Sequence, residues 1–164
     1  MTIALRLTHD EPRLVYLALV YHLGRPGSEL DPATVAPSEH GLRSVKVALE
    51  RDLAADDAVI ELDEEQYRKL LSAIYGSVNE LRVHHMRGGG ASTVERFSET
   101  ARSLFPDLAQ DPARALDVAE AMIMLHRRIE RAVARAAEAA GEEPSASATG
   151  TKRGRWPFRR ARRR

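Results

Sequence analysis

The chain has 164 residues, with 25 Lys and Arg against 24 Asp and Glu, six His and no Cys. This length suits one domain with extensions, because most domains have roughly 100–150 residues. The lack of Cys excludes a disulfide framework and a thiolate metal site, and the composition excludes a collagen-like chain. The basic residues are 22 Arg and 3 Lys, a bias typical of a GC-rich bacterial genome.

The formal net charge of +1 conceals two parts of opposite sign. Residues 152–164 contain eight basic residues and no acidic residue. Residues 1–151 contain 17 basic residues against 24 acidic ones, a net charge of −7. The sequence therefore describes an acidic body followed by a strongly basic tail.

Two features of the sequence bear on localisation. The N-terminal stretch MTIALRLTHDEPR has no basic region followed by an apolar one, so it does not resemble a secretory signal. The longest nearly apolar run, residues 14–23, has ten residues and is interrupted by His22, whereas a membrane span needs about 20. We therefore expect a cytoplasmic protein.

The first element in chain order is a short strand that leads into a helix. Alternating apolar residues in MTIALRL predict a half-buried strand over residues 1–7. Thr8 and Glu11 form a T-x-x-E capping box, which predicts the start of a helix that runs to about His22. This helix is apolar on nearly all sides, as expected of a central buried element. Prolines and glycines then predict a loop over residues 24–37.

The next segment predicts a helix, a strand and a longer helix. The helix covers about 38–53 and the strand 58–62. Asp63 and Gln66 form a capping box for the third helix. Its apolar stripe, with spacings of three and four, consists of Tyr67, Leu70, Leu71, Ile74, Val78, Leu81 and His85.

The last third of the chain predicts two more helices. After glycines 88–90, a fourth helix covers about 93–104 and stops before Pro106. Asp111 followed by Pro112 is a strong start signal for a last helix to about residue 140. Its apolar seam packs within a bundle or pairs with a second protomer, and Met124 is expected to fill the core beside Met122. The seam consists of Val118, Met122, Leu125, Ile129, Ala132, Ala136 and Ala139.

Residues 5–11 and 60–66 share a strand-then-capped-helix pattern. A duplication would relate two strand–helix units by a pseudo-twofold axis and pair the two strands. The simpler explanation is that any strand running into a capped helix has this pattern.

Taken together, these elements predict a mainly α fold. We expect a single helical, bundle-like domain of about five helices with a minor two-stranded β element over residues 1–140. Residues 141–151 are rich in small residues and predict a flexible linker. Residues 152–164 form an Arg-rich tail that is predicted to be disordered.

The sequence offers few markers of catalysis. It has no Cys nucleophile, no G-x-S-x-G motif and no H-E-x-x-H spacing, which favours a non-enzymatic protein. His22, His85 and His126 lie on or near apolar helix faces and would form a metal or ligand site only if the fold brought them together. Core or boundary histidines are the simpler interpretation, so we expect no metal and no cofactor. A small enzyme or ligand-binding bundle with an interhelical site remains an alternative.

The tail is the segment that departs most from an ordinary globular background. Its Arg side chains suit phosphates and its two aromatic rings suit unpaired bases, which predicts RNA or DNA binding without sequence specificity. An anionic membrane surface is the alternative partner, and a solvated tail is the simplest interpretation. The candidate polyanion-binding residues are Lys152, Arg153, Arg155, Trp156, Phe158, Arg159, Arg160, Arg162, Arg163 and Arg164.

Overall fold

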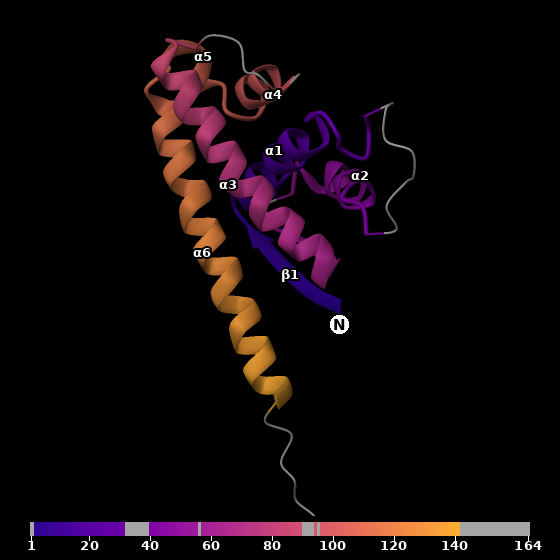
Figure 1. Ribbon diagram of the computed structural model, residues 1–164. Coiled ribbons are helices and arrows are strands. Elements are labelled where there is room, and N and C mark those ends of the chain that lie inside the picture. The colour runs from indigo at the N-terminus through magenta and orange to yellow at the C-terminus, as the bar shows by residue number, and fades with distance from the viewer. Residues whose placement is uncertain (1, 32–39, 56, 90–93, 95, 142–164) are drawn as a thin grey trace, which may run out of the picture.

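The computed structural model describes residues 2–31, 40–55, 57–89, 94 and 96–141 (Figure 1). Over these ranges it contains six helices and one two-stranded antiparallel sheet. The predicted mainly α fold with a minor β element is confirmed. The predicted linker beyond Gly141 and the tail lie outside the described residues.

The two predicted strands pair with each other. β1 (Thr2–Thr8) runs antiparallel to β2 (Asp57–Asp63), with Leu5 opposite Ile60 at the centre. Both strands alternate exposed and buried residues, so one face of the sheet is buried and the other is open to solvent. A two-stranded sheet persists only when other elements cover it. The buried face consists of Ile3, Leu5, Leu7, Ala58, Ile60 and Leu62.

The helices that follow the two strands begin in different ways. At α3 (Glu64–Met86), Asp63 Oδ1 accepts from the Gln66 amide at 2.8 Å, and Gln66 Oε1 accepts from the Asp63 amide at 3.0 Å, which confirms the capping box. At α1 (Glu11–Leu23), the predicted box is only half present. Glu11 Oε2 accepts from the Thr8 amide at 2.8 Å, but the N-cap is Asp10 and its side chain makes no capping bond.

The second helix starts later than predicted, because its cap comes from a distant residue. α2 (Arg43–Asp52) follows Leu42 as its N-cap. The Glu29 carboxylate accepts from the Leu42 amide at 2.7 Å and from the Arg43 amide at 3.2 Å. Glu29 therefore ties the loop after α1 to the start of α2, and no local motif in the sequence indicates this.

Between α3 and the last helix lie the predicted fourth helix and a single-turn helix that was not predicted. α4 (Phe97–Leu104) begins after Arg96, which has a left-handed φ of 62°. The single turn α5 (Asp107–Gln110) then precedes α6 (Arg114–Gly141). Asp111 Oδ1 accepts from the Ala113 amide at 2.9 Å, so Asp111 binds a backbone amide just before the last helix. The helix itself begins at Arg114, three residues after Asp111.

α3 and α6 lie side by side and form the longest helix pair of the fold (Figure 1). The first four residues of the predicted α6 seam are buried, so the seam packs within the chain. Met122 is fully buried, but Met124 is 52% exposed, which corrects the expectation that both methionines fill the core. Ala132 is half-buried, and the side chains of Ala136 and Ala139 lie outside the described part.

α1 crosses α3 at a glycine. A Cβ placed on Gly76 would lie 2.1 Å from Cε1 of Tyr21, far inside van der Waals contact. The Tyr21 ring also meets the buried Phe97 ring edge-on, with centroids 6.0 Å apart and an interplanar angle of 79°. The ring is therefore held between α3 and α4, and only glycine leaves room for it.

We expect Gly76→Ala to destabilise the protein, although alanine is intrinsically favoured by about 1 kcal/mol over glycine in a helix. The added methyl displaces a rigid ring, and overpacking costs about 1–3 kcal/mol. Chemical denaturation should show a lower free energy of unfolding. Ser72→Ala, at an exposed position of the same helix, is the control and should be near neutral. A Gly76→Ala protein as stable as the control would refute this role of Gly76.

A histidine on the loop before α2 contacts the cap of α3. His40 Nδ1 lies 2.9 Å from Asp63 Oδ2, and the His40 carbonyl accepts from Lys69 Nζ at 2.9 Å. The hydrogen bond and the charge of Asp63 raise the pKa of His40 above its usual value. The Gln66 amide, together with His40, lowers the pKa of Asp63.

The His40–Asp63 pair gives a pH dependence whose sign follows from these shifts. The pKa of His40 is higher in the folded than in the unfolded state. The His40–Asp63 pair therefore contributes its full stability below the unfolded pKa of about 6.5. This contribution is lost as the pH rises through the folded pKa. We expect an NMR titration to show this raised pKa, and Asp63→Asn to bring it back towards 6.5. Asp57→Asn, at the other end of β2, is the control. An unchanged pKa in Asp63→Asn would contradict the assignment.

Candidate nucleic-acid interface

All ten predicted polyanion-binding residues belong to residues 152–164, which lie outside the described residues. The structure does describe α6, the helix that leads to them. α6 continues beyond the N-terminal end of α3 and past the sheet (Figure 1). Ala134, Arg135 and Glu138 are exposed there. The end of α6 therefore stands away from the bundle as a short arm.

The exposed side of α6 carries a row of arginines that starts beside α3 and continues onto this arm. Arg127, Arg131 and Arg135 are all exposed and four residues apart, so they lie on successive turns with a rise of about 6 Å between them. Nε of Arg131 and of Arg135 each donate to the carbonyl four residues earlier at 3.2 Å. Within the described ranges, none of the three forms an ion pair with a carboxylate. We call these residues the α6 arginine row.

Arg128, the neighbour of the first member of the row, has a different role. Its Nη2 donates to Glu11 Oε2 at 2.6 Å and to the Arg6 carbonyl at 3.1 Å. The same Glu11 oxygen accepts from the Thr8 amide, so three elements meet at one carboxylate. Arg128 thereby anchors α6 to the corner between β1 and α1, just where the arginine row begins.

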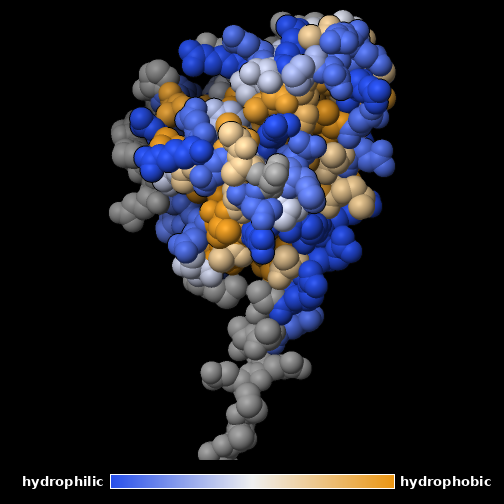
Figure 2. All heavy atoms as spheres, turned by 180° about the vertical axis from the view of Figure 1, so that it is seen from behind, coloured by the Kyte–Doolittle hydropathy of each residue, from blue (hydrophilic) through white to orange (hydrophobic). Residues whose placement is uncertain are grey.

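The exposed surface of α6 carries charges of both signs along its length. Asp117 and Glu120 are exposed in its first half, and Glu130 and Glu138 are exposed near the members of the arginine row. Seen from behind, hydrophilic side chains cover the end of the helix next to the grey segment (Figure 2). Asp117 in the first turn complements the helix macrodipole, whereas the last turn contains no basic residue.

The three histidines considered as a cluster have separate neighbours. His22 is mostly buried on α1, and His85 and His126 are half-buried on α3 and α6. Among the described residues, no group of three or more His, Asp or Glu side chains is placed to hold a metal ion. His22 lies 3.3 Å from Arg25 Nη2 and 3.8 Å from Glu29, His85 lies 3.4 Å from the Pro112 carbonyl, and His126 lies 3.2 Å from Glu130.

The buried histidine of α3 is His84, which is 3% exposed, rather than His85. Its backbone carbonyl accepts from the Gly89 amide at 2.9 Å. A Cβ on Gly89, whose φ is +87°, would lie 3.7 Å from His84 Nε2. The glycine turn therefore folds back over His84, a contact that helical periodicity alone does not indicate.

The comparisons with known proteins add no relative. The chain matches no family model, no curated protein and no solved structure at a significant level. In the part of the chain that the structure describes, no helix is both long enough and apolar enough to cross a bilayer. The function must therefore be argued from the charges and contacts of this chain alone.

Substitutions of Arg128 and of its neighbour Arg127 test whether Arg128 anchors α6. Arg128→Ala removes charge-assisted hydrogen bonds to Glu11 and to a backbone carbonyl, so we expect the free energy of unfolding to fall by about 1–2 kcal/mol. Arg127→Ala removes the same charge from an exposed site and should change it by less than about 0.5 kcal/mol. Urea denaturation measures both. Equal effects of the two substitutions would show that Arg128 is no anchor.

Proposed function

We propose that the protein is a non-enzymatic nucleic-acid-binding protein whose Arg-rich tail, residues 152–164, contacts RNA or DNA without sequence specificity. One observation carries this proposal. Eight basic residues without an acidic one follow a helix whose exposed end carries the arginine row. The row and the tail supply eleven positive charges at one end of an otherwise acidic chain.

The chemistry of these residues fits a single strand. A guanidinium group donates two parallel hydrogen bonds to phosphate oxygens, and such contacts hold the backbone without reading its sequence. Trp156 and Phe158 stand among the cations, and stacking of an aromatic ring on an unpaired base is worth about 1–3 kcal/mol. Unpaired bases are accessible in single strands, so we expect single-stranded RNA or DNA to bind more tightly than a duplex.

The charge of the body supports binding at this end of the molecule. The net charge of −7 over residues 1–151 repels a polyanion from most of the surface. α6 carries the end of its arginine row, Arg131 and Arg135, towards the arm, and Arg128 fixes the direction of the helix (Figure 1). A strand bound by the tail would therefore meet the row before it meets the acidic bundle.

The proposal predicts a salt dependence that can be measured by fluorescence anisotropy with a labelled single-stranded RNA. If the tail neutralises about five phosphates, it should contribute about −3.5 to the slope of log K against log salt, and three contacts by the arginine row should add about −2. Replacing all eight basic tail residues by Gln should abolish binding. The triple variant Arg127→Gln, Arg131→Gln, Arg135→Gln should reduce the slope by about 2, because each phosphate contact contributes about 0.7.

A matched triple variant shows whether the change in slope comes from the arginine row or from the loss of any three positive charges. Arg13→Gln, Arg43→Gln and Arg51→Gln remove the same charge from exposed positions on α1 and α2 and should leave the slope unchanged. Unchanged RNA affinity in the tail variant would contradict the proposal. Tail-dependent binding to anionic vesicles without RNA binding would also contradict it and would support the membrane alternative.

A further inference from the structure

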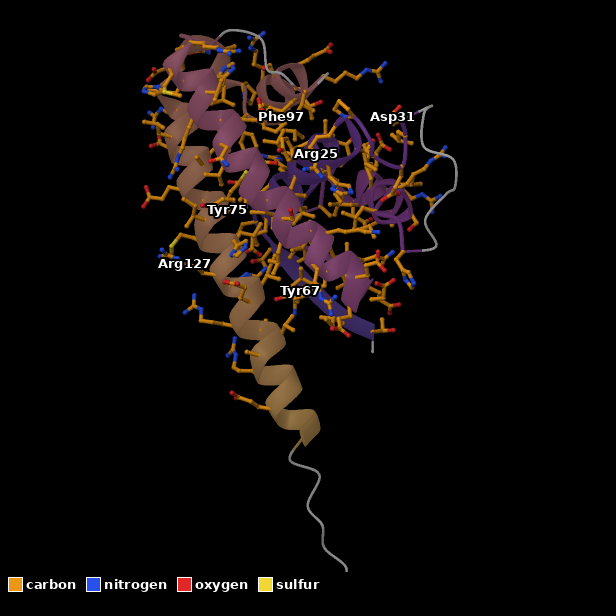
Figure 3. The ribbon with its side chains drawn as sticks, viewed as in Figure 1. Arg25, Asp31, Tyr67, Tyr75, Phe97 and Arg127 are labelled. Atoms are coloured by element: carbon orange, nitrogen blue, oxygen red, sulfur yellow. The ribbon has the colours of Figure 1, made fainter. Side chains whose placement is uncertain are left out.

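The body contains a cleft of about 800 Å³ that the function proposed for the tail does not involve. It lies where α1, α2 and α4 meet residues 24–31, on a different side from the arginine row. Figure 3 shows Arg25 and Asp31 on the side of α1, α2 and α4, whereas Arg127 lies on α6. Its volume is within the range of about 300–1,000 Å³ that is common for small-molecule sites.

Three cations from three elements line this cleft. Arg25 follows α1, Lys46 comes from α2 and Arg96 precedes α4. Two acids, Asp31 and Glu50, also line it, so the net charge of the lining is +1 within a body of net −7. Asp31 accepts from the Gly27 amide. Glu50 accepts from the Tyr16 hydroxyl at 3.0 Å and forms an ion pair with Lys46, with its Oε2 3.7 Å from Nζ.

Arg25 is held in place by aromatic and imidazole groups rather than by a carboxylate. Its guanidinium carbon lies 5.3 Å from the centroid of the Tyr21 ring, and its Nη2 lies 3.3 Å from His22 Nδ1. Because a guanidinium group only donates, His22 must accept at Nδ1 and is therefore neutral. Burial, and secondarily the charge of Arg25, lower the pKa of His22, in agreement with this protonation state.

This arrangement leaves the charge of Arg25 available. The Tyr21 ring beneath it is fixed by Gly76 and Phe97, so the guanidinium rests on a rigid support. Its Nε is buried and has no hydrogen-bond partner among the described residues. A cation that is positioned before a ligand arrives loses little conformational entropy on binding.

The rest of the lining provides a second cation and an apolar wall. Lys46 Nζ lies 4.8 Å from the centroid of the Tyr16 ring and is half-buried. Val20, Leu23 and Leu30 contribute apolar surface, and Leu30 is 48% exposed. An apolar wall with a few convergent polar groups is typical of a small-molecule site.

We propose that this cleft binds a small organic phosphate, with its phosphate group between Arg25 and Lys46 and its organic part against the apolar wall. A single carboxylate is satisfied by one bidentate arginine. Separate cations from several elements better match a phosphate, which carries more charge and more acceptor oxygens. The proposal is independent of nucleic-acid binding by the tail.

The test uses the ¹⁵N-labelled full-length protein, phenyl phosphate as the probe and NMR chemical shifts as the readout. Site-resolved shifts are needed because the basic tail also attracts anions. We expect saturable shifts at the amides of Gly24, Ser28 and Thr100, and weaker binding of benzoate at equal ionic strength. Arg25→Gln and Lys46→Gln should each weaken binding by about tenfold or more, as loss of a charge-assisted hydrogen bond implies.

Two comparisons make the test decisive. Arg51→Gln removes an exposed cation of α2 outside the cleft and should leave the affinity unchanged. Lys46→Gln retains the contact between Arg25 and Tyr21, so it remains informative if Arg25→Gln disturbs folding. Shifts confined to α6 and the residues after it would overturn the proposal. Equal affinity for benzoate, or unchanged affinity in both cleft variants, would overturn it as well.

Discussion

The antiparallel pairing of β1 with β2 is the constraint on which the other elements depend. β1 is followed by α1 after two residues, and β2 runs into α3 without any interval, so the register of the strands sets where both helices start. α1 then crosses α3 at Gly76, and α6 lies along α3. Arg128 connects α6 back to the corner of β1 and α1. The direction of the arm that leads to the tail thus follows from the strand pairing.

Local signals predicted most of the fold, and distant contacts account for what they missed. Alternation predicted both strands. The Asp63 capping box and the first four residues of the α6 seam are confirmed, because residues close together in the sequence produce them. The Glu29 cap of α2 and the burial of His84 depend on groups that only the folded chain brings together. The Thr8 box is only half present because α1 begins at Glu11 with Asp10 as its N-cap, so Thr8 lies too early in the chain to cap it.

The candidate interface was only partly visible in the sequence. The tail stands out because eight basic residues occur without an acidic one. The arginine row does not stand out in the sequence, because Glu130 and apolar residues lie between its members. Only the orientation of α6 shows that the three arginines share an exposed face. The cleft was also hidden, since its cations come from three separate elements and its volume depends on how α1, α2 and α4 meet. Charge composition thus indicates a kind of partner, whereas only the fold shows where cations gather.

The central claim is that nucleic acid binds at the tail and the arginine row and not on the acidic bundle. Ultraviolet cross-linking of the full-length protein to a single-stranded RNA, followed by mass spectrometry, locates the contacts directly. Cross-links at Trp156, Phe158 and their neighbours in residues 152–164, with further ones along the end of α6, are the expected result. Cross-links confined to the sheet, α1 or α2, with none in the tail, would contradict this account.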